Sequence, residues 1–155
     1  MQLKMKQIAV AVSGLCLAAA ALAADRKIDK SALPAAVRTT ADQQSVGATV
    51  TGYSSEKEYG KLEYEVHMTV NGHSKDLTIA PDGKLIEIEE QVAMADLPAE
   101  VQAALRTKAG KGTIARIESL TKHGTLLAYE ARVVTAGKRS EVQVGPNGET
   151  LNHEK

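Results

Sequence analysis

The clearest pattern along the chain is an alternation of apolar and polar residues between Leu62 and Val70. Successive side chains of a β-strand point to opposite faces of its sheet, so this alternation predicts a strand with one buried face and one face in water. Asn71-Gly72 follows, and this pair favours the tight primed turn of a hairpin. A partner strand is therefore expected near 74–80.

The residues after this hairpin indicate a further strand. Pro81-Asp82-Gly83 has the composition of a tight turn. Ile86 and Ile88 are expected on one face of the strand that follows, with Glu87 and Glu89 on the other. Together these segments predict an antiparallel meander with one apolar face, which a helix can cover.

Two segments have the spacing of helices. Segment 33–44 opens on Leu33-Pro34, and a second helix opens on Leu97-Pro98. Asp96 is the expected N-cap of the second helix, because Asp favours that position and Pro favours the first turn. Gly110 is its expected C-cap, since glycine accepts the left-handed conformation in which many helices end.

The chain also repeats one pattern. Leu33-Pro34-Ala35-Ala36-Val37 returns 64 positions later as Leu97-Pro98-Ala99-Glu100-Val101. After one inserted residue the offset becomes 65, which pairs Tyr64-Glu65 with Tyr129-Glu130. The kept order predicts a duplicated unit. The second copy is expected to have a strand at 113–120, inward-facing Leu127, Tyr129, Ala131, Val133, Val142 and Val144, and a short last strand after Pro146-Asn147-Gly148.

These patterns predict an α+β fold of two tandem units. Each unit has a helix plus four antiparallel strands, and the two form one helix-backed antiparallel sheet. The expected boundaries are a signal peptide at 1–23, a first unit at 24–92 and a second unit at 93–155. Because a unit of about 60 residues buries barely enough surface to be stable alone, the two are expected to pack as one rigid domain.

The first residues have the order of a secretory signal peptide. Two lysines precede an uncharged apolar run from 8 to 20, and Ala21-Leu22-Ala23 is a small-x-small cleavage signal. Cleavage after Ala23 is expected, with cleavage after Ala24 or an uncleaved anchor as alternatives. Cleavage would remove Cys16, the single cysteine, and export without disulfides favours a bacterial periplasm. No membrane segment would remain after cleavage.

The tandem motifs resemble a known family. The L-P-x-x-V helix start, the Tyr-Glu strand and the P-(D/N)-G turn, behind an export signal, resemble the PepSY-like proteins, which are similar in fold to secreted beta-lactamase-inhibitor proteins. The resemblance covers about 31–153 and implies an eight-stranded antiparallel sheet with helices on one face. It also implies a non-enzymatic envelope role, in which the protein binds or inhibits a partner such as a peptidase. The chain lacks the aromatic-rich face and the disulfides of the inhibitors, which argues against beta-lactamase inhibition in particular.

Composition narrows the function classes. A nucleic-acid binder usually has a basic patch and aromatic residues that stack on bases. This chain has no Phe or Trp, and without the signal peptide it has 17 basic and 19 acidic residues. It has no G-x-S-x-G motif, and Gly110-Lys111-Gly112-Thr113 lacks the spacing of a phosphate loop. We therefore expect no catalytic residues, no metal ligands, no cofactor and no nucleic-acid partner.

The residues best suited to bind a partner lie on the polar face of the predicted sheet. A regular polar face without a catalytic motif predicts a protein partner that is held by charge and hydrogen bonds. The candidates are Glu63, Glu65, His67, Glu87, Glu89, Glu130 and Arg132.

Two other functions stay open at this point. His67 and His73 could approach each other on their hairpin and, with a glutamate, hold Zn²⁺ or Cu²⁺, while the acidic first copy could bind Ca²⁺. A metal- or calcium-responsive envelope protein is therefore the alternative. A hydrolase is the third hypothesis, and it requires a pocket with an activated nucleophile.

The two copies differ in charge. Residues 33–92 contain five basic and ten acidic residues, whereas residues 97–155 contain nine basic and six acidic residues. Opposite charges could draw the two halves together or steer a partner to one of them.

Overall fold

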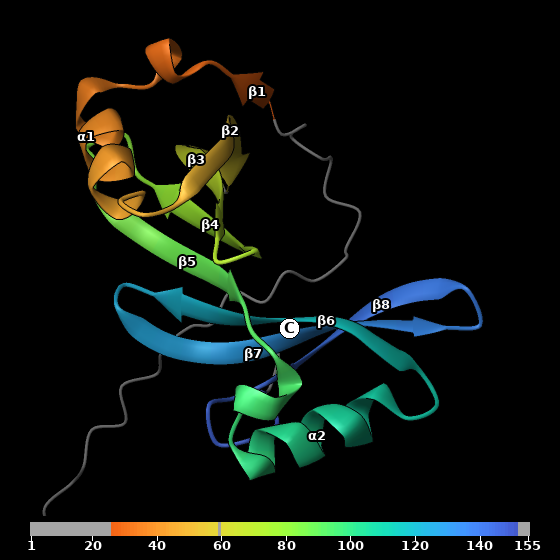
Figure 1. The fold of residues 1–155 in the computed structure, drawn as a ribbon. Helices are drawn as coiled ribbons and strands as arrows, with labels where there is room; N and C mark the ends of the chain where they lie inside the picture. Colours follow the sequence, from red (N-terminus) through yellow and green to blue (C-terminus); the bar gives the residue numbers. More distant parts are fainter. Residues whose placement is uncertain (1–25, 59, 152–155) are drawn as a thin grey trace, which may run out of the picture.

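The computed structural model describes residues 26–58 and 60–151, which form an α+β fold. One eight-stranded antiparallel sheet contains its strands in sequence order (Figure 1). The strands are β1 (Arg26–Ile28), β2 (Thr49–Glu58), β3 (Lys61–Val70), β4 (His73–Ile79), β5 (Leu85–Gln91), β6 (Thr113–Lys122), β7 (Thr125–Thr135) and β8 (Lys138–Val144). The α-helices of the described ranges are α1 (Ala35–Gln44) and α2 (Ala99–Ala109), which follow the 3₁₀ turns η1 (Lys30–Ala32) and η2 (Met94–Asp96). None of these helices is long and apolar enough to cross a membrane.

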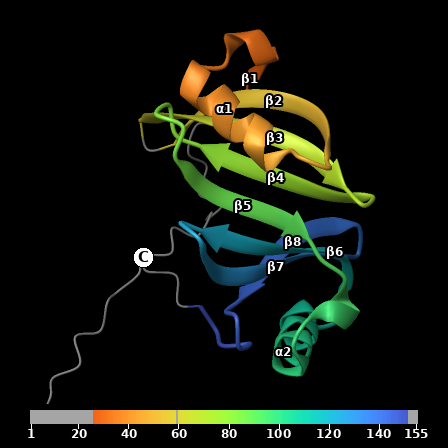
Figure 2. The ribbon, with the colours of Figure 1, turned by 60° about the vertical axis from the view of Figure 1, so that its left-hand side comes forward.

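Both α-helices lie on the same face of the sheet. Figures 1 and 2 show α1 against the strands of the first half and α2 against those of the second. Residues in register on adjacent strands share a face. The pairs Val66–Leu77, Leu77–Ile88 and Ile88–Thr121 carry one face from β3 to β6, and Ile117 continues it to α2. In the part of the chain that the structure describes, no helix covers the opposite face, which we call the open face.

The buried apolar side chains form two clusters, one under each helix. Val37 and Ala41 of α1 face the first cluster, and Val101 and Leu105 of α2 face the second. The buried strand residues are Val66, Met68, Leu77 and Ile79 under α1, and Ile117, Ala131 and Val144 under α2. Aliphatic side chains therefore form the core of a protein without Phe or Trp.

A tight turn in each half lies against the first turn of a helix. A Cβ atom added to Gly83, between β4 and β5, would come within 2.8 Å of the Ala36 carbonyl oxygen of α1. A Cβ atom added to Gly148, after β8, would come within 2.6 Å of the Glu100 carbonyl oxygen of α2. Both glycines have positive φ angles, 87° and 81°, which other residues rarely adopt. Each turn thus approaches a helix more closely than a side chain would allow.

Much of the predicted local structure is confirmed. β3 and β4 form the hairpin expected from the alternation, and Asn71 and Gly72 have the positive φ angles of a primed turn, 50° and 83°. β6 contains the predicted strand 113–120. Gly110 caps the C-terminus of α2 with a φ of 57°.

Two predicted boundaries are wrong, the N-cap of the second helix and the last strand. Asp96 is not the N-cap of α2, because it belongs to η2, and Pro98 occupies the cap position without a side-chain hydrogen bond. The strand expected after Pro146-Asn147-Gly148 is absent from the described residues, which end at Leu151. There the chain turns back on itself, with the Gly145 amide donating to the Glu149 carbonyl. The eighth strand is instead β1, paired with β2 at the other edge.

The predicted signal peptide, 1–23, lies outside the described residues.

The strand register shifts at four places, and two of these β-bulges overturn the predicted face of a residue. Thr78 pairs with Glu87 but Ile79 pairs with Leu85, so Ile86 is an extra residue in β5. Ile86 therefore lies on the open face beside Glu87, and the prediction that it shares a face with Ile88 is wrong. In β7, Leu127 is the extra residue between the pairs Leu120–Ala128 and Thr121–Leu126. Leu127 is half-buried and lies outside both core clusters, contrary to its predicted inward position.

Candidate functional site

A cleft of about 280 Å³ lies on the open face of the sheet. Its lining comes from every strand from β2 to β8, and it includes the apolar side chains of Ile86 and Leu120. The cations of the lining are Lys122 and, when protonated, His67. Its carboxylates are Glu56, Glu63, Glu65, Asp76, Glu87, Glu89 and Glu130. We call this surface the acidic cleft.

Six of the seven predicted binding residues line the acidic cleft. They are Glu63, Glu65, His67, Glu87, Glu89 and Glu130. Arg132 lies outside the lining, and its guanidinium approaches Glu141 of β8 at 3.6 Å. The sheet therefore gathers the candidates of both halves into one surface, because Glu89 and Leu120 are in register across the β5–β6 pair.

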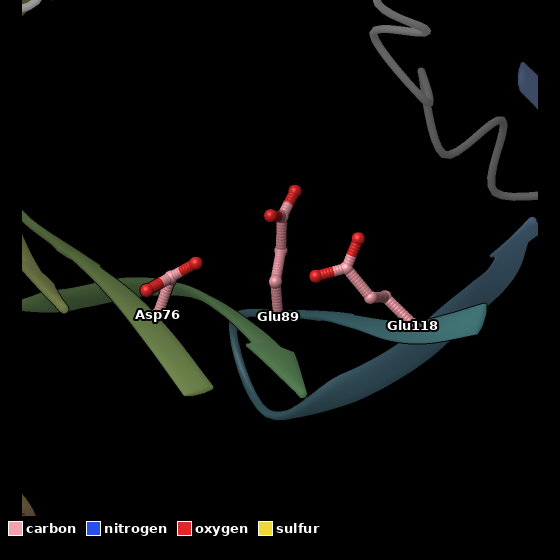
Figure 3. A group of neighbouring side chains, drawn as sticks. All are labelled: Asp76, Glu89 and Glu118. Carbon is pink, nitrogen blue, oxygen red and sulfur yellow. The ribbon is translucent and has the colours of Figure 1, made fainter. Parts of the chain in front are cut away.

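The most crowded part of this face holds three carboxyl groups from adjacent strands. Asp76 of β4, Glu89 of β5 and Glu118 of β6 each have an oxygen within 4.8 Å of an oxygen of the other two, and Figure 3 shows their side chains rising from neighbouring strands. Burial raises the pKa of Glu89 from 4.5 to about 7, and the charges of Glu87, Glu118, Glu130 and Asp76 add to the shift. Glu89 is thus partly protonated near neutral pH.

Glu130 of β7 is perturbed in the same direction. Burial raises its pKa above 4.5, whereas a hydrogen bond donated by the Gln143 side chain acts against that shift. Two carboxyl groups of the cleft therefore resist ionisation, mainly because they are partly buried and also because other carboxylates lie nearby.

Two basic groups of the open face are already held by carboxylates. The Lys122 ammonium lies 3.2 Å from Glu87, and the Arg116 guanidinium donates to both Glu118 and the Ser74 hydroxyl. These contacts neutralise part of the acidic cleft and hold Glu87 and Glu118 in place.

His67 lies at the centre of a polar chain across three strands. Its Nδ1 is 3.0 Å from Asp76 Oδ1, and its Nε2 is 3.0 Å from Ser54 Oγ and 3.6 Å from Glu65 Oε2. The Ser54 hydroxyl donates to Glu65 over 2.6 Å. Asp76 and Glu65 therefore lie on opposite sides of the imidazole.

Ser54, His67 and Asp76 are linked in a row by hydrogen bonds, but their geometry does not favour a nucleophilic serine. Ser54 is only 1% exposed, and its proton is directed to Glu65 rather than to His67. A nucleophilic serine needs an open approach for the substrate and a base that takes its proton. The arrangement instead orients the imidazole and two carboxylates toward the cleft.

The approach of His67 to His73, which the alternative metal site requires, does not occur. In the β3–β4 register His67 pairs with Asp76, whereas His73 is an odd number of residues from Asp76 and so points to the other face. Within residues 26–58 and 60–151, the side chains with oxygen atoms close enough to share a cation are those of Asp76, Glu89 and Glu118. They form an all-oxygen set of the kind that hard cations such as Ca²⁺ prefer.

Sequence reasoning missed Ser54, Asp76 and Glu118. The signal for Asp76 was present, because a two-residue turn at Asn71-Gly72 places Asp76 opposite His67. Ser54 and Glu118 depend on the β2–β3 and β5–β6 pairings, and no turn motif in the sequence sets either register. Ser54 is therefore placed by the register of the β2–β3 hairpin, and Glu118 by the pairing that joins the two halves of the sheet.

Comparison with known proteins identifies relatives in fold. No protein-family model matches the chain, and no curated protein sequence matches it. A putative periplasmic protein from Bacteroides eggerthii matches with a TM-score of 0.64 at 15% identity, over 77% of this chain and 86% of that one.

Two further solved structures match at 15% identity and over 77% of this chain. A DUF2874 family protein from Bacteroides ovatus has a TM-score of 0.62 and is covered over 85% of its length. A BLIP-like protein from Bacteroides fragilis has a TM-score of 0.58 and is covered over 84%. At this identity the likeness concerns the fold alone: the chain is similar in fold to a putative periplasmic protein, a DUF2874 family protein and a BLIP-like protein.

Proposed function

We propose that this protein is a non-catalytic binding module that engages a protein partner through the open face of its sheet. The observation that carries the proposal is the acidic cleft, which collects seven carboxylates from both halves of the chain. A cleft with this excess of one charge attracts and orients a partner that carries the opposite charge. The inhibition or regulation of a peptidase is one form that this activity would take.

The composition of the open face sets the expected strength of binding. Strong protein interfaces usually depend on buried aromatic and Arg anchors. The described lining of the acidic cleft contains no Tyr and no Arg, and its apolar part consists mainly of Ile86 and Leu120. We therefore expect modest affinity that falls steeply with ionic strength.

Export to the periplasm and membership of the PepSY-like proteins belong to the same proposal. The signal pattern at 1–23 supports export, and relatives in fold are called periplasmic proteins. The L-P-x-x-V and P-(D/N)-G motifs support the family. N-terminal sequencing of the exported protein should find Ala24 as its first residue, and retention of Met1 would contradict cleavage.

We also propose that the fold arose from two tandem units. The sequence offset of 64 to 65 residues relates Gly83 to Gly148 and Ala36 to Glu100. The two glycines make the same close approach to the first turns of α1 and α2. A shared contact at shared positions supports duplication, although β1 and the absence of a strand at 149–151 make the halves unequal.

Capture from a periplasmic extract tests the binding proposal. Immobilised protein should retain a partner at low salt, and the double substitution Glu65→Gln and Glu87→Gln, the cleft variant, should lose it. Asp29→Asn with Glu100→Gln is the matched control, because both residues are exposed and lie outside the cleft. Equal capture by the wild type and the cleft variant would overturn the proposal.

A second candidate function is the binding of a divalent cation. The specific observation is the oxygen cluster of Asp76, Glu89 and Glu118 (Figure 3). Calorimetric titration with Ca²⁺ should then give a saturable heat that Glu118→Gln reduces at least tenfold in affinity, whereas Glu100→Gln leaves it unchanged. A flat titration with Ca²⁺, Mg²⁺, Zn²⁺ and Cu²⁺ would remove this candidate.

A further inference from the structure

A group of exposed cations lies at one end of the second half of the molecule. Lys108 and Lys111 belong to the end of α2 and the loop after it, and Lys138 and Arg139 begin β8. All four are exposed, and none forms an ion pair within the described ranges. We call these four residues the basic end.

The fold brings these cations together at one edge. Thr113, the first residue of β6, pairs with Val134 of β7, and Val134 pairs with Arg139 of β8. The start of β6, just after Lys111, is thus two strands from Arg139. Figure 1 shows the loop after α2 and the β7–β8 hairpin on the same side of the molecule.

The acidic cleft and the basic end are complementary in charge and occupy different parts of the sheet. Both lie along β6, which carries Lys122 in the cleft and begins with Thr113 beside the basic end. Nine residue steps along β6 span roughly 30 Å, whereas Gln143, the lining residue of β8, is four steps from Arg139. β6 pairs with β7 along its length and with β5 from Glu118 to Lys122, and these pairings keep the strand extended.

From these positions we propose that the acidic cleft of one molecule receives the basic end of a second copy. The contact is heterologous, since it joins two different surfaces. A molecule that has used its cleft still presents its basic end, and the reverse also holds. Such a contact extends head to tail unless its rotation closes a ring.

The contact goes beyond the proposed function, because it requires no other protein. Its energy would come from charges at an exposed surface, where individual ion pairs are weak and screened by salt. The assembly is therefore expected at high protein concentration and low ionic strength, and it should dissolve in about 0.5 M NaCl. A protein partner with a basic surface would compete with it for the cleft.

Sedimentation equilibrium of the natively expressed protein tests the proposal with two one-sided variants. The cleft variant, Glu65→Gln with Glu87→Gln, keeps the basic end. The end variant, Lys111→Glu with Lys138→Glu, keeps the cleft. At low salt the wild type should grow beyond dimers as its concentration rises, whereas each variant alone should remain monomeric.

An equimolar mixture of the two variants gives the decisive measurement. One intact cleft and one intact basic end remain between them, so the mixture should form dimers that do not grow further. Lys57→Glu with Lys84→Glu makes the same charge change on exposed residues outside both surfaces, and it should associate like the wild type. A monomeric wild type at low salt, or a mixture that stays monomeric, would overturn the proposal.

The same variants separate this inference from the proposed function. The end variant retains the acidic cleft and should still capture a protein partner from extract. Retained capture together with a monomeric wild type would remove self-association alone. Self-association without any captured partner would instead remove the proposed function and leave the present inference standing.

Discussion

Glu89 shows how a single residue reports on the whole open face. Its carboxyl group lies among Asp76, Glu87, Glu118 and Glu130, and burial together with these charges raises its pKa to about 7. An unfolded chain would release the proton near 4.5. The folded protein therefore binds an extra proton between these two values, and its stability falls as the pH rises through that window.

Glu89→Gln should remove this pH dependence. A shift from 4.5 to about 7 corresponds to about 3 kcal/mol of lost stability above the folded pKa. Urea unfolding should therefore find the Gln variant more stable than the wild type at pH 8 by an amount of this order. The two proteins should converge below pH 4.5, where Glu89 is protonated in both the folded and the unfolded state. A constant difference across this range would show that Glu89 titrates normally.

Gly83 offers a second residue-scale prediction. Ala at this position would be strained by the positive φ and would also push against the Ala36 carbonyl of α1. Gly124 has a φ of 78° with nothing within 4 Å of an added Cβ, so Gly124→Ala measures the φ strain alone. Chemical unfolding should place Gly83→Ala about 1–3 kcal/mol below that control. Equal losses would mean that the turn can move away from the helix.

The positions of single residues could be predicted where a local sequence pattern determines them. The alternation in 62–70 correctly placed Glu63, Glu65 and His67 on a polar face. The pattern could not show that Ser54 and Asp76 would hold the imidazole of His67, because those contacts join three strands. Nor could it predict the pKa of Glu89, which depends on burial and on charges from four strands.

At the scale of elements, each helix is held by its own cluster of aliphatic side chains. Leu105 is fully buried between α2 and the strands of the second half. Leu105→Ala should cost about 2–5 kcal/mol, since it removes buried methyl groups and leaves a cavity. Leu62→Ala is the control, because Leu62 is 38% exposed and should cost less than about 1 kcal/mol. Similar losses in thermal unfolding would contradict the packing described under α2.

Elements were predicted better in their cores than at their ends. Hydrophobic spacing identified both helices and most strands, because an element that is buried on one face has apolar residues at the period of that element. The bulges at Ile86 and Leu127 have no comparable signal in the sequence, because an extra apolar residue does not change the apolar composition of its strand. β1 escaped prediction because three residues are too few to show any alternation.

At the scale of the whole molecule, the carboxylates of the open face repel one another, and salt can screen this repulsion. Screening acts on like charges as well as on ion pairs, and the acidic cleft has far more carboxylates than cations. Added NaCl should therefore stabilise the folded protein at pH 7.5, by about 0.5–1 kcal/mol. The cleft variant should show a smaller salt response in urea unfolding, whereas a response equal to the wild type would assign the effect to other surfaces.

The order of the strands has a consequence for how the protein forms. Every strand of the sheet pairs with its immediate neighbours in sequence, from β1 to β8. A chain that emerges one end first, from a ribosome or a translocation pore, can add each hairpin to structure that already exists. Contacts between sequence neighbours also close small loops, which favours fast folding. The meander thus allows the sheet to form strand by strand from the end of the chain that emerges first, because each strand pairs with the one before it.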